Sequence, residues 1–189
     1  MSLRGEFEAL DVAVYAAIAG ADTPILDRAL GPLSRAADNS RLWIAAAAVL
    51  ASTGGRRGRR AAVNGLASVA ATSAVVNVVL KPLAGRRRPD PGSHRVPVAR
   101  LVKMPGSTSF PSGHSASAYA FAAGASSAFP AVALPLQAAA GLVAYSRVHT
   151  GVHYPVDVIA GALVGASIAP IVPSVLSRGR AVLHGRHQT

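Results

Sequence analysis

The sequence predicts an all-α protein, a polytopic membrane bundle of about five to six transmembrane or membrane-embedded helices. Its 189 residues are 51% hydrophobic and only 14% charged, whereas an average globular domain is about one quarter charged. The apolar residues also gather into runs. The run at residues 61–80 carries no charged residue and is long enough to cross the hydrocarbon core of a bilayer. We therefore expect one membrane-embedded domain over residues 1–189.

Charge and cysteine content narrow the function classes. The chain has 19 Lys plus Arg against 8 Asp plus Glu, a net charge of +11, which is typical of proteins that bind nucleic acid, an anionic membrane or an anionic substrate. Nucleic acid is not favoured, because few aromatic residues are available for stacking and no basic helix stands apart. The absence of cysteine excludes disulfides, thiol chemistry and cysteine-ligated zinc. No signal peptide is expected, because acidic residues interrupt the first apolar run.

The N-terminal segment, residues 1–40, is predicted to form amphipathic helices. Residues 6–20 alternate acidic with apolar residues, so this helix can lie in the membrane interface or form a short first span. A second helix is expected over residues 24–37, with Thr23 as its cap and Pro24 as its first residue. The Gly-Pro pair in its middle is expected to disturb it. A pair of surface helices without a membrane role is an equally good interpretation.

Residues 41–176 are predicted to form the catalytic helix bundle. Its expected helices are residues 42–53, 61–80, 114–129, 131–145 and 156–176. A compact basic turn at residues 54–60 joins the first two. The polar stretch at residues 81–113 is rich in Pro, Gly, Arg and Ser and is expected to be a functional loop. Gly161 and Gly165 should allow close packing of the last helix, although a soluble all-α core is an alternative to the membrane bundle.

The basic residues predict how the chain is oriented in the cell membrane. Positively charged segments favour the cytoplasmic side, which places the turn at residues 54–60 and the basic tail at residues 177–189 in the cytoplasm. Residues 81–113 and 146–157 then meet on the extracytoplasmic face. The arginines within residues 81–113 break the rule there, and an anionic substrate bound at that face would explain them.

The segments on this face carry groups suited to binding a phosphate ester. Lys81, Arg88 and Arg147 supply positive charge, and the planar fork of an arginine matches phosphate oxygens. Ser112 is a good cap for the helix that follows it, and Gly113 allows backbone to approach a ligand closely. The first N–H groups of that helix would point at an anion.

His153 and Asp157 are predicted to form the nucleophilic pair. Asp157 would accept a hydrogen bond from Nδ1 of His153 and leave Nε2 free to attack phosphorus. His114 would protonate the leaving group and later deprotonate a water molecule. A metal-binding face through His149, His153 and Asp157 is a weaker alternative, because Pro155 interrupts that helix and the nearby cations would repel a metal. We expect no metal and no cofactor, and His149 has no assigned role.

These residues fall into three motifs that resemble those of the type 2 phosphatidic acid phosphatase superfamily. Residues 81–89 follow the pattern K-x6-R-P, residues 111–114 read P-S-G-H, and residues 146–157 match S-R-x5-H-x3-D. The resemblance implies metal-independent hydrolysis of lipid phosphates by the integral membrane branch. It implies the same roles for catalytic His153, Asp157 and His114 and for phosphate-binding Lys81, Arg88, Ser112, Gly113 and Arg147.

The motifs recognise phosphate rather than the lipid tail, so several substrates fit. The expected partners are the bilayer and a phosphomonoester or diphosphate of a membrane lipid. Candidates are polyprenyl-linked phosphates, including decaprenylphosphoryl-phosphoribose, and phosphatidate or phosphatidylglycerophosphate. A phosphohistidine intermediate is expected. Alternative functions are a non-catalytic lipid-phosphate binder or flippase, and a vanadate-dependent haloperoxidase of the same superfamily.

Overall fold

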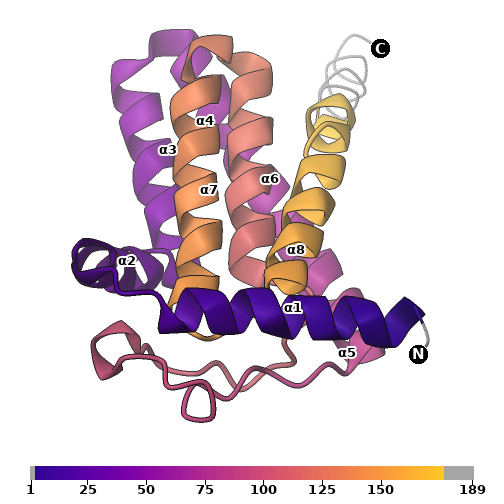
Figure 1. Cartoon of the computed structure of the whole chain (residues 1–189). Coiled ribbons are helices and arrows are strands. Elements are labelled where there is room, and N and C mark those ends of the chain that lie inside the picture. The colour runs from indigo at the N-terminus through magenta and orange to yellow at the C-terminus, as the bar shows by residue number, and fades with distance from the viewer. Residues whose placement is uncertain (1–2, 177–189) are drawn as a thin grey trace, which may run out of the picture.

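The computed structural model describes residues 3–176, and all regular secondary structure among them is helical. Five helices stand side by side as a bundle (Figure 1). They are α3 (Arg41–Thr53), α4 (Gly55–Ala74), α6 (Gly113–Ala128), α7 (Ala133–His149) and α8 (Pro155–Ile168). Two further helices, α1 (Leu3–Gly20) and α2 (Pro24–Ala36), lie across one end of the bundle, next to the loop that joins α5 (Lys81–Ala84) to α6.

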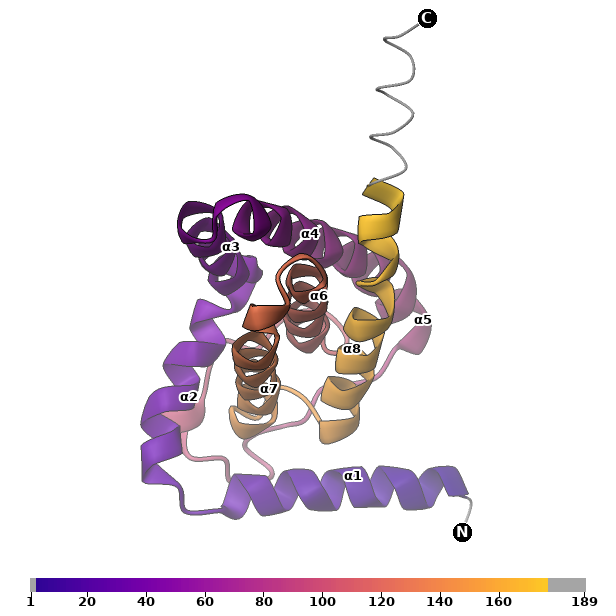
Figure 2. The same cartoon turned by 90° about the horizontal axis from the view of Figure 1, so that it is seen from above.

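Helix α6 is the centre of the bundle. It contacts α4, α7 and α8 and is surrounded by them when the bundle is viewed along its axis (Figure 2). Small residues allow these close approaches, because a Cβ atom at Gly161 or Gly165 of α8 would collide with backbone carbonyls of Ser112 and Ala116. The predicted packing role of the two glycines is therefore confirmed, and it brings the starts of α6 and α8 together.

Three continuous helices are long and apolar enough to cross a membrane, and a fourth span is reached if the bent pair α1 and α2 counts as one. The three are Gly55–Ala84, Pro130–His149 and Pro155–Leu176. The shorter α3 and α6 run alongside them in the bundle. The predicted all-α bundle of membrane-embedded helices is confirmed, with five helices in the bundle itself.

The predicted basic turn at residues 54–60 is wrong. Only Gly54 and Gly55 make the turn, where Gly55 adopts a left-handed φ of 57°, and α4 begins at Gly55. Its four arginines therefore occupy the first turns of α4 (Figure 1). Arginine is a good helix former, so a run of arginines beside two glycines does not need to be a loop.

The predicted loop at residues 81–113 begins later than expected. The helix that starts at Gly55 continues through a π-helical segment, Val75–Leu80, and ends at Ala84. Gly85 stops it with a left-handed φ of 59°, as glycine commonly does after a helix. Lys81 is consequently held on the last turn of a long helix. Segments of π-helix often lie at functional sites.

Helix α2 differs from its prediction in two details. It begins at Pro24 with Thr23 at the N-cap position, as predicted, but the Thr23 side chain accepts no bond from a backbone N–H and its hydroxyl instead donates to Oδ1 of Asp27 at 3.1 Å. The expected disturbance at Pro32 is also wrong, because the helix continues through that proline to Ala36. Helix α2 packs against α7 and against Val98–Arg100, and such tertiary contacts can override the low helix propensity of a proline. The predicted basic tail, residues 177–189, lies outside the described residues.

Candidate active site

The predicted site residues meet at the end of the bundle that α1 and α2 cover. A cavity of about 310 Å³ opens there. Its lining includes five of the eight predicted residues, namely Lys81, Arg88, Gly113, His114 and His153. The α2–α3 connection and the last turns before Lys81 complete the wall. Residues from distant parts of the sequence therefore share one polar cavity.

His153 lies in the turn between α7 and α8, and Asp157 lies in the first turn of α8. Their closest atoms are Nδ1 and Oδ2, at 3.5 Å. Oδ2 also accepts hydrogen bonds from the Ser109 hydroxyl at 2.5 Å and from the Tyr154 backbone N–H at 2.9 Å. The carboxylate is thus fixed on the Nδ1 side of the ring, and a proton on Nδ1 leaves Nε2 free.

The other ring nitrogen of His153 faces Arg88. Nη1 of Arg88 lies 3.1 Å from Nε2 and also donates to the Val152 carbonyl at 2.8 Å. Burial lowers the pKa of His153 to about 4, even though the nearby Asp157 carboxylate acts in the opposite direction. The imidazole is therefore neutral at pH 7, and its Nε2 carries a lone pair that can act as a nucleophile.

A short segment of the long loop, Ser107–Ser109, holds the charged groups in place. Ser107 Oγ accepts from Nζ of Lys81 at 2.9 Å and from Nη2 of Arg88 at 3.3 Å. The Thr108 hydroxyl donates to the Lys81 carbonyl at 3.2 Å. Gly113 faces the same space, because a Cβ there would point to within 3.8 Å of Lys81 Nζ. Two cations and a helix start thus converge where a phosphate would be bound.

His114 has a carboxylate partner that no motif contains. Its Nε2 lies 2.8 Å from Oδ1 of Asp38. Asp38 belongs to the connection between α2 and α3, where Asn39 and Ser40 both have positive φ angles of 52° and 59°. This backbone conformation is uncommon for residues other than glycine and turns the connection toward the cavity, which both residues line.

Two predicted phosphate ligands do not line the cavity. Arg147 is buried in the last turns of α7, and its Nη1 donates to the Ser34 hydroxyl at 2.5 Å. Its Nε has no hydrogen-bond partner among the described residues. Ser112 caps α6, as expected, by accepting from the Ser115 N–H at 3.4 Å, and its own N–H donates to the Asp157 carbonyl at 2.8 Å. Neither residue therefore belongs to the lining, although Nη1 of Arg147 lies 3.9 Å from Oδ1 of Asp38, the partner of His114.

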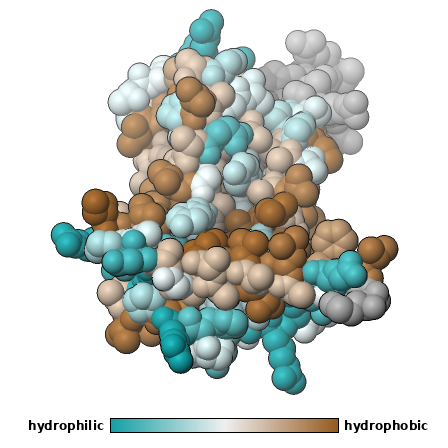
Figure 3. Space-filling model, viewed as in Figure 1, coloured by the Kyte–Doolittle hydropathy of each residue, from teal (hydrophilic) through white to brown (hydrophobic). Residues whose placement is uncertain are grey.

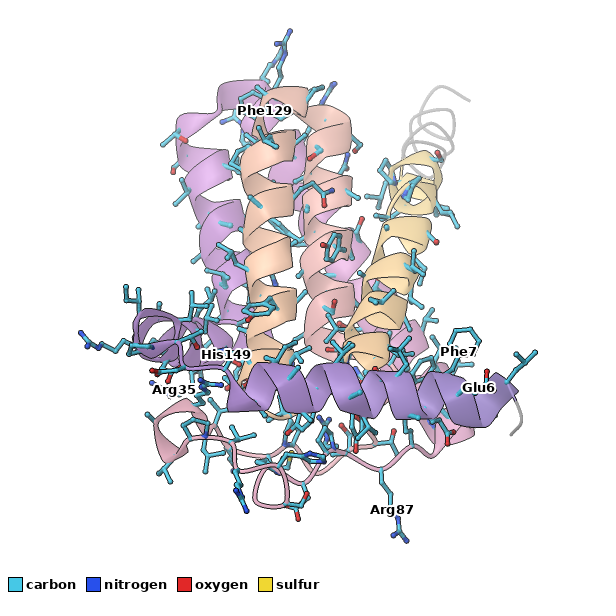
Figure 4. The ribbon with its side chains drawn as sticks, viewed as in Figure 1. Glu6, Phe7, Arg35, Arg87, Phe129 and His149 are labelled. Carbon is cyan, nitrogen blue, oxygen red and sulfur yellow. The ribbon has the colours of Figure 1, made fainter. Side chains whose placement is uncertain are left out.

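His149 belongs to a different cluster. Its Nε2 lies 2.9 Å from Oδ1 of Asp27, which also accepts from Nε of Arg100 at 2.7 Å. Arg100 additionally donates to the carbonyls that end α1. The cluster ties α7 and the long loop to the α1–α2 corner, and Figure 4 shows His149 at that corner. A metal-binding face through His149, His153 and Asp157 is thus not favoured.

Comparisons with known proteins show which family and fold this chain resembles. A family model described as the PAP2 superfamily matches residues 62–180. The decaprenylphosphoryl-5-phosphoribose phosphatase of Mycobacterium tuberculosis is 34% identical over 174 residues, which are 91% of each protein. The crystal structure of LpxE from Aquifex aeolicus has a TM-score of 0.68 at 23% identity, covering 87% of this chain and 95% of that one.

A second solved structure has the same fold. It is a transmembrane PAP2-type phosphatidylglycerolphosphate phosphatase from Bacillus subtilis, with a TM-score of 0.65 at 23% identity, covering 92% of this chain and 87% of that one. The expectation of a membrane-embedded phosphatase is confirmed by these relatives. The match of the family model and the identity to a relative over most of both chains show that this protein belongs to the PAP2 superfamily.

Proposed function

We propose that the protein hydrolyses the phosphomonoester of a polyprenyl-linked sugar phosphate and releases inorganic phosphate. The reaction proceeds through a phosphohistidine intermediate and uses no metal. The observation that carries this proposal is the placement of His153. One ring nitrogen lies against Asp157, and the other faces Arg88 at the cavity. The named function of the Mycobacterium tuberculosis relative supports the choice of substrate.

In the first step, the lone pair on Nε2 of His153 attacks phosphorus. The bond between phosphorus and the ester oxygen breaks, and the electron pair of that bond leaves with the oxygen. Lys81 and Arg88 neutralise the oxygens of the phosphoryl group during the transfer. The phosphate replaces the imidazole as the partner of Arg88, whose Nη1 otherwise lies 3.1 Å from Nε2.

The leaving alkoxide needs a proton, and His114 is the group placed to supply it. One of its ring nitrogens is bound to Asp38, so the other is left for the leaving oxygen. Burial and the nearby Arg147 lower the pKa of His114 to about 4, and Asp38 acts against this shift. The negative charge of a bound phosphate adds to that of Asp38 and favours the imidazolium form that acts as the acid. In the second step, neutral His114 takes a proton from water as the water oxygen attacks the phosphohistidine. The N–P bond breaks, phosphate is released, and His153 becomes neutral again.

A panel of purified lipid phosphates tests this function. The panel contains decaprenylphosphoryl-phosphoribose, a polyprenyl diphosphate, phosphatidylglycerophosphate and phosphatidate. We expect the fastest phosphate release from the first substrate. We also expect undiminished activity in EDTA, and inhibition by vanadate because it mimics five-coordinate phosphorus. Lipid binding without phosphate release from any member would instead indicate a binder or flippase. Bromide oxidation after addition of vanadate would indicate a haloperoxidase.

The active site is proposed to face the extracytoplasmic side. Helix α4 begins, with its four arginines, at the opposite end of the bundle from α5 (Figure 1), whose Lys81 lines the cavity. Cytoplasmic ends of spans are enriched in Lys and Arg. This orientation gives the enzyme access to lipid phosphates of the outer leaflet.

Single cysteines test the orientation, since the chain has no native cysteine. A membrane-impermeant maleimide applied to intact cells should label Gly92→Cys in the long loop and should not label Arg57→Cys in α4. Both positions are exposed. The neighbouring Gly58 is unsuitable for a cysteine substitution, because a side chain there would collide with the Leu50 carbonyl. Labelling of Arg57→Cys alone would place the active site in the cytoplasm.

A further inference from the structure

The catalytic carboxylate has a second, unpredicted connection that leads to α1. Nη1 of Arg86 donates to Oδ1 of Asp157 at 2.7 Å, and Nη2 of Arg86 donates to Oδ2 of Asp11 at 2.6 Å. Asp11 lies in the middle of α1. Its other oxygen accepts from the Val156 N–H at 2.9 Å, in the first turn of α8. One guanidinium therefore joins α1 to the residue that orients His153.

The charges explain why this connection matters. Asp11 and Asp157 are both buried, and Arg86 lies between them. Without its positive charge, two buried anions would face each other, and one of them would be driven to its protonated form. A protonated Asp157 would be a poor acceptor for Nδ1 of His153. The Tyr154 ring, 4.5 Å from the guanidinium carbon, further fixes the position of Arg86.

The rest of α1 has the character of a membrane-surface helix. Leu3, Phe7, Leu10 and Val14 recur at helical spacing and are between 41% and 75% exposed. Asp11, by contrast, faces the protein. The helix runs across the ends of the bundle helices (Figures 1 and 2), so it lies in the plane of the membrane when the bundle crosses it.

Apolar residues also gather around the level of α1 on the surface of the molecule. Figure 3 shows apolar residues gathered at the level of α1, above the hydrophilic surface of the long loop. The Phe7 ring lies on the side of α1 from which α8 rises, whereas Arg87 points away from the bundle (Figure 4). On α8, Ile159 and Leu163 are also exposed. An apolar stripe at this level fits the boundary between lipid headgroups and acyl chains.

We propose that α1 is a membrane-surface helix that positions the catalytic pair: its apolar stripe binds the bilayer interface, and its buried Asp11 holds Arg86 on Asp157. Membrane binding by α1 and the geometry of the reacting imidazole are thereby coupled through one arginine. The proposal rests on the proposed function only where Asp157 and His153 are taken as the reacting pair. Asp11 and Arg86 act as positioning residues.

Kinetic measurements in proteoliposomes test the positioning role. We expect Asp11→Asn and Arg86→Gln each to lower kcat at least about tenfold with little change in KM. The double variant should lose no more than the larger single loss, because both changes break the same connection. Arg86→Lys should retain more of kcat than Arg86→Gln, since an ammonium group can reach one carboxylate. Exposed Asp22→Asn and Arg87→Gln serve as matched controls and should keep wild-type kcat.

A pair of fluorescent labels tests whether the apolar stripe of α1 binds the membrane, and this test does not require enzymatic activity. An environment-sensitive fluorophore is attached to Phe7→Cys or to the neighbouring Glu6→Cys, both at exposed positions of α1. In lipid vesicles, the label at position 7 should emit at shorter wavelength and resist an aqueous quencher, whereas the label at position 6 should be quenched.

The outcomes separate the two proposals. Three results would each overturn the positioning role. They are a wild-type kcat in Asp11→Asn, a loss of kcat in the double variant equal to the product of the single losses, and an equal loss of kcat in Arg86→Lys and Arg86→Gln. Equal quenching of the two labels would overturn the proposed binding of α1 to the membrane interface. Failure of the proposed function appears separately, as a wild-type protein that binds vesicles through α1 but releases no phosphate.

Discussion

Replacing His153 with alanine is expected to lower phosphate release by more than about 10⁴-fold, because the nucleophile of a two-step reaction is lost. The wild-type imidazole is neutral at pH 7, since burial lowers its pKa to about 4. Its loss therefore removes the lone pair that attacks phosphorus, while the cations that bind the substrate stay in place. We expect the affinity for the lipid phosphate to change far less than kcat.

His149→Ala is the matched control for this variant. His149 is also a buried histidine, only four residues earlier, but it bonds to Asp27 outside the cavity. The control should lower thermal stability and leave the activity of the folded protein close to that of the wild type. A substrate with a radioactive phosphoryl group should label the wild-type protein through an acid-labile bond and should leave His153→Ala unlabelled. Full activity of His153→Ala would exclude the proposed mechanism.

The motif residues could be predicted because their chemistry is local in sequence. Asp157 follows His153 by four residues, and a helix start between them brings the carboxylate to Nδ1. Lys81 and Arg88 are also close in sequence, and both bind Ser107. The long polar loop between apolar runs was predicted as a segment without regular helix, and it carries Arg88 and Ser107 to the cavity, although the helix before it continues to Ala84.

The partners of these residues could not be predicted in the same way. Asp38 reaches His114 across 76 positions of sequence, and Arg86 reaches Asp157 across 71. These contacts depend on how α1 and α2 cross the end of the bundle, and no spacing in the sequence encodes that crossing. In the sequence, Asp11 is only one of the acidic residues that interrupt the first apolar run. Its burial against the start of α8 gives that acidic residue a structural reason.

His114→Gln is expected to lower phosphate release from an alkyl phosphate lipid by about 10²–10⁴-fold, the usual contribution of a general acid. The loss should depend on the leaving group. An alkoxide departs slowly without a proton, whereas nitrophenolate is stable enough to leave unprotonated. With p-nitrophenyl phosphate, the variant should therefore release one equivalent of nitrophenol at nearly the wild-type rate.

This burst of one equivalent of nitrophenol should then stop, because hydrolysis of the phosphohistidine also needs His114. Water must lose a proton to attack the phosphohistidine, and glutamine cannot accept it, so the phosphorylated protein should accumulate. Asp38→Asn provides the matched comparison. It removes the carboxylate that lies 2.8 Å from Nε2 but leaves the imidazole, so we expect a smaller loss with the same dependence on the leaving group. An equal loss with both substrates and no burst would mean that His114 binds phosphate rather than transferring protons.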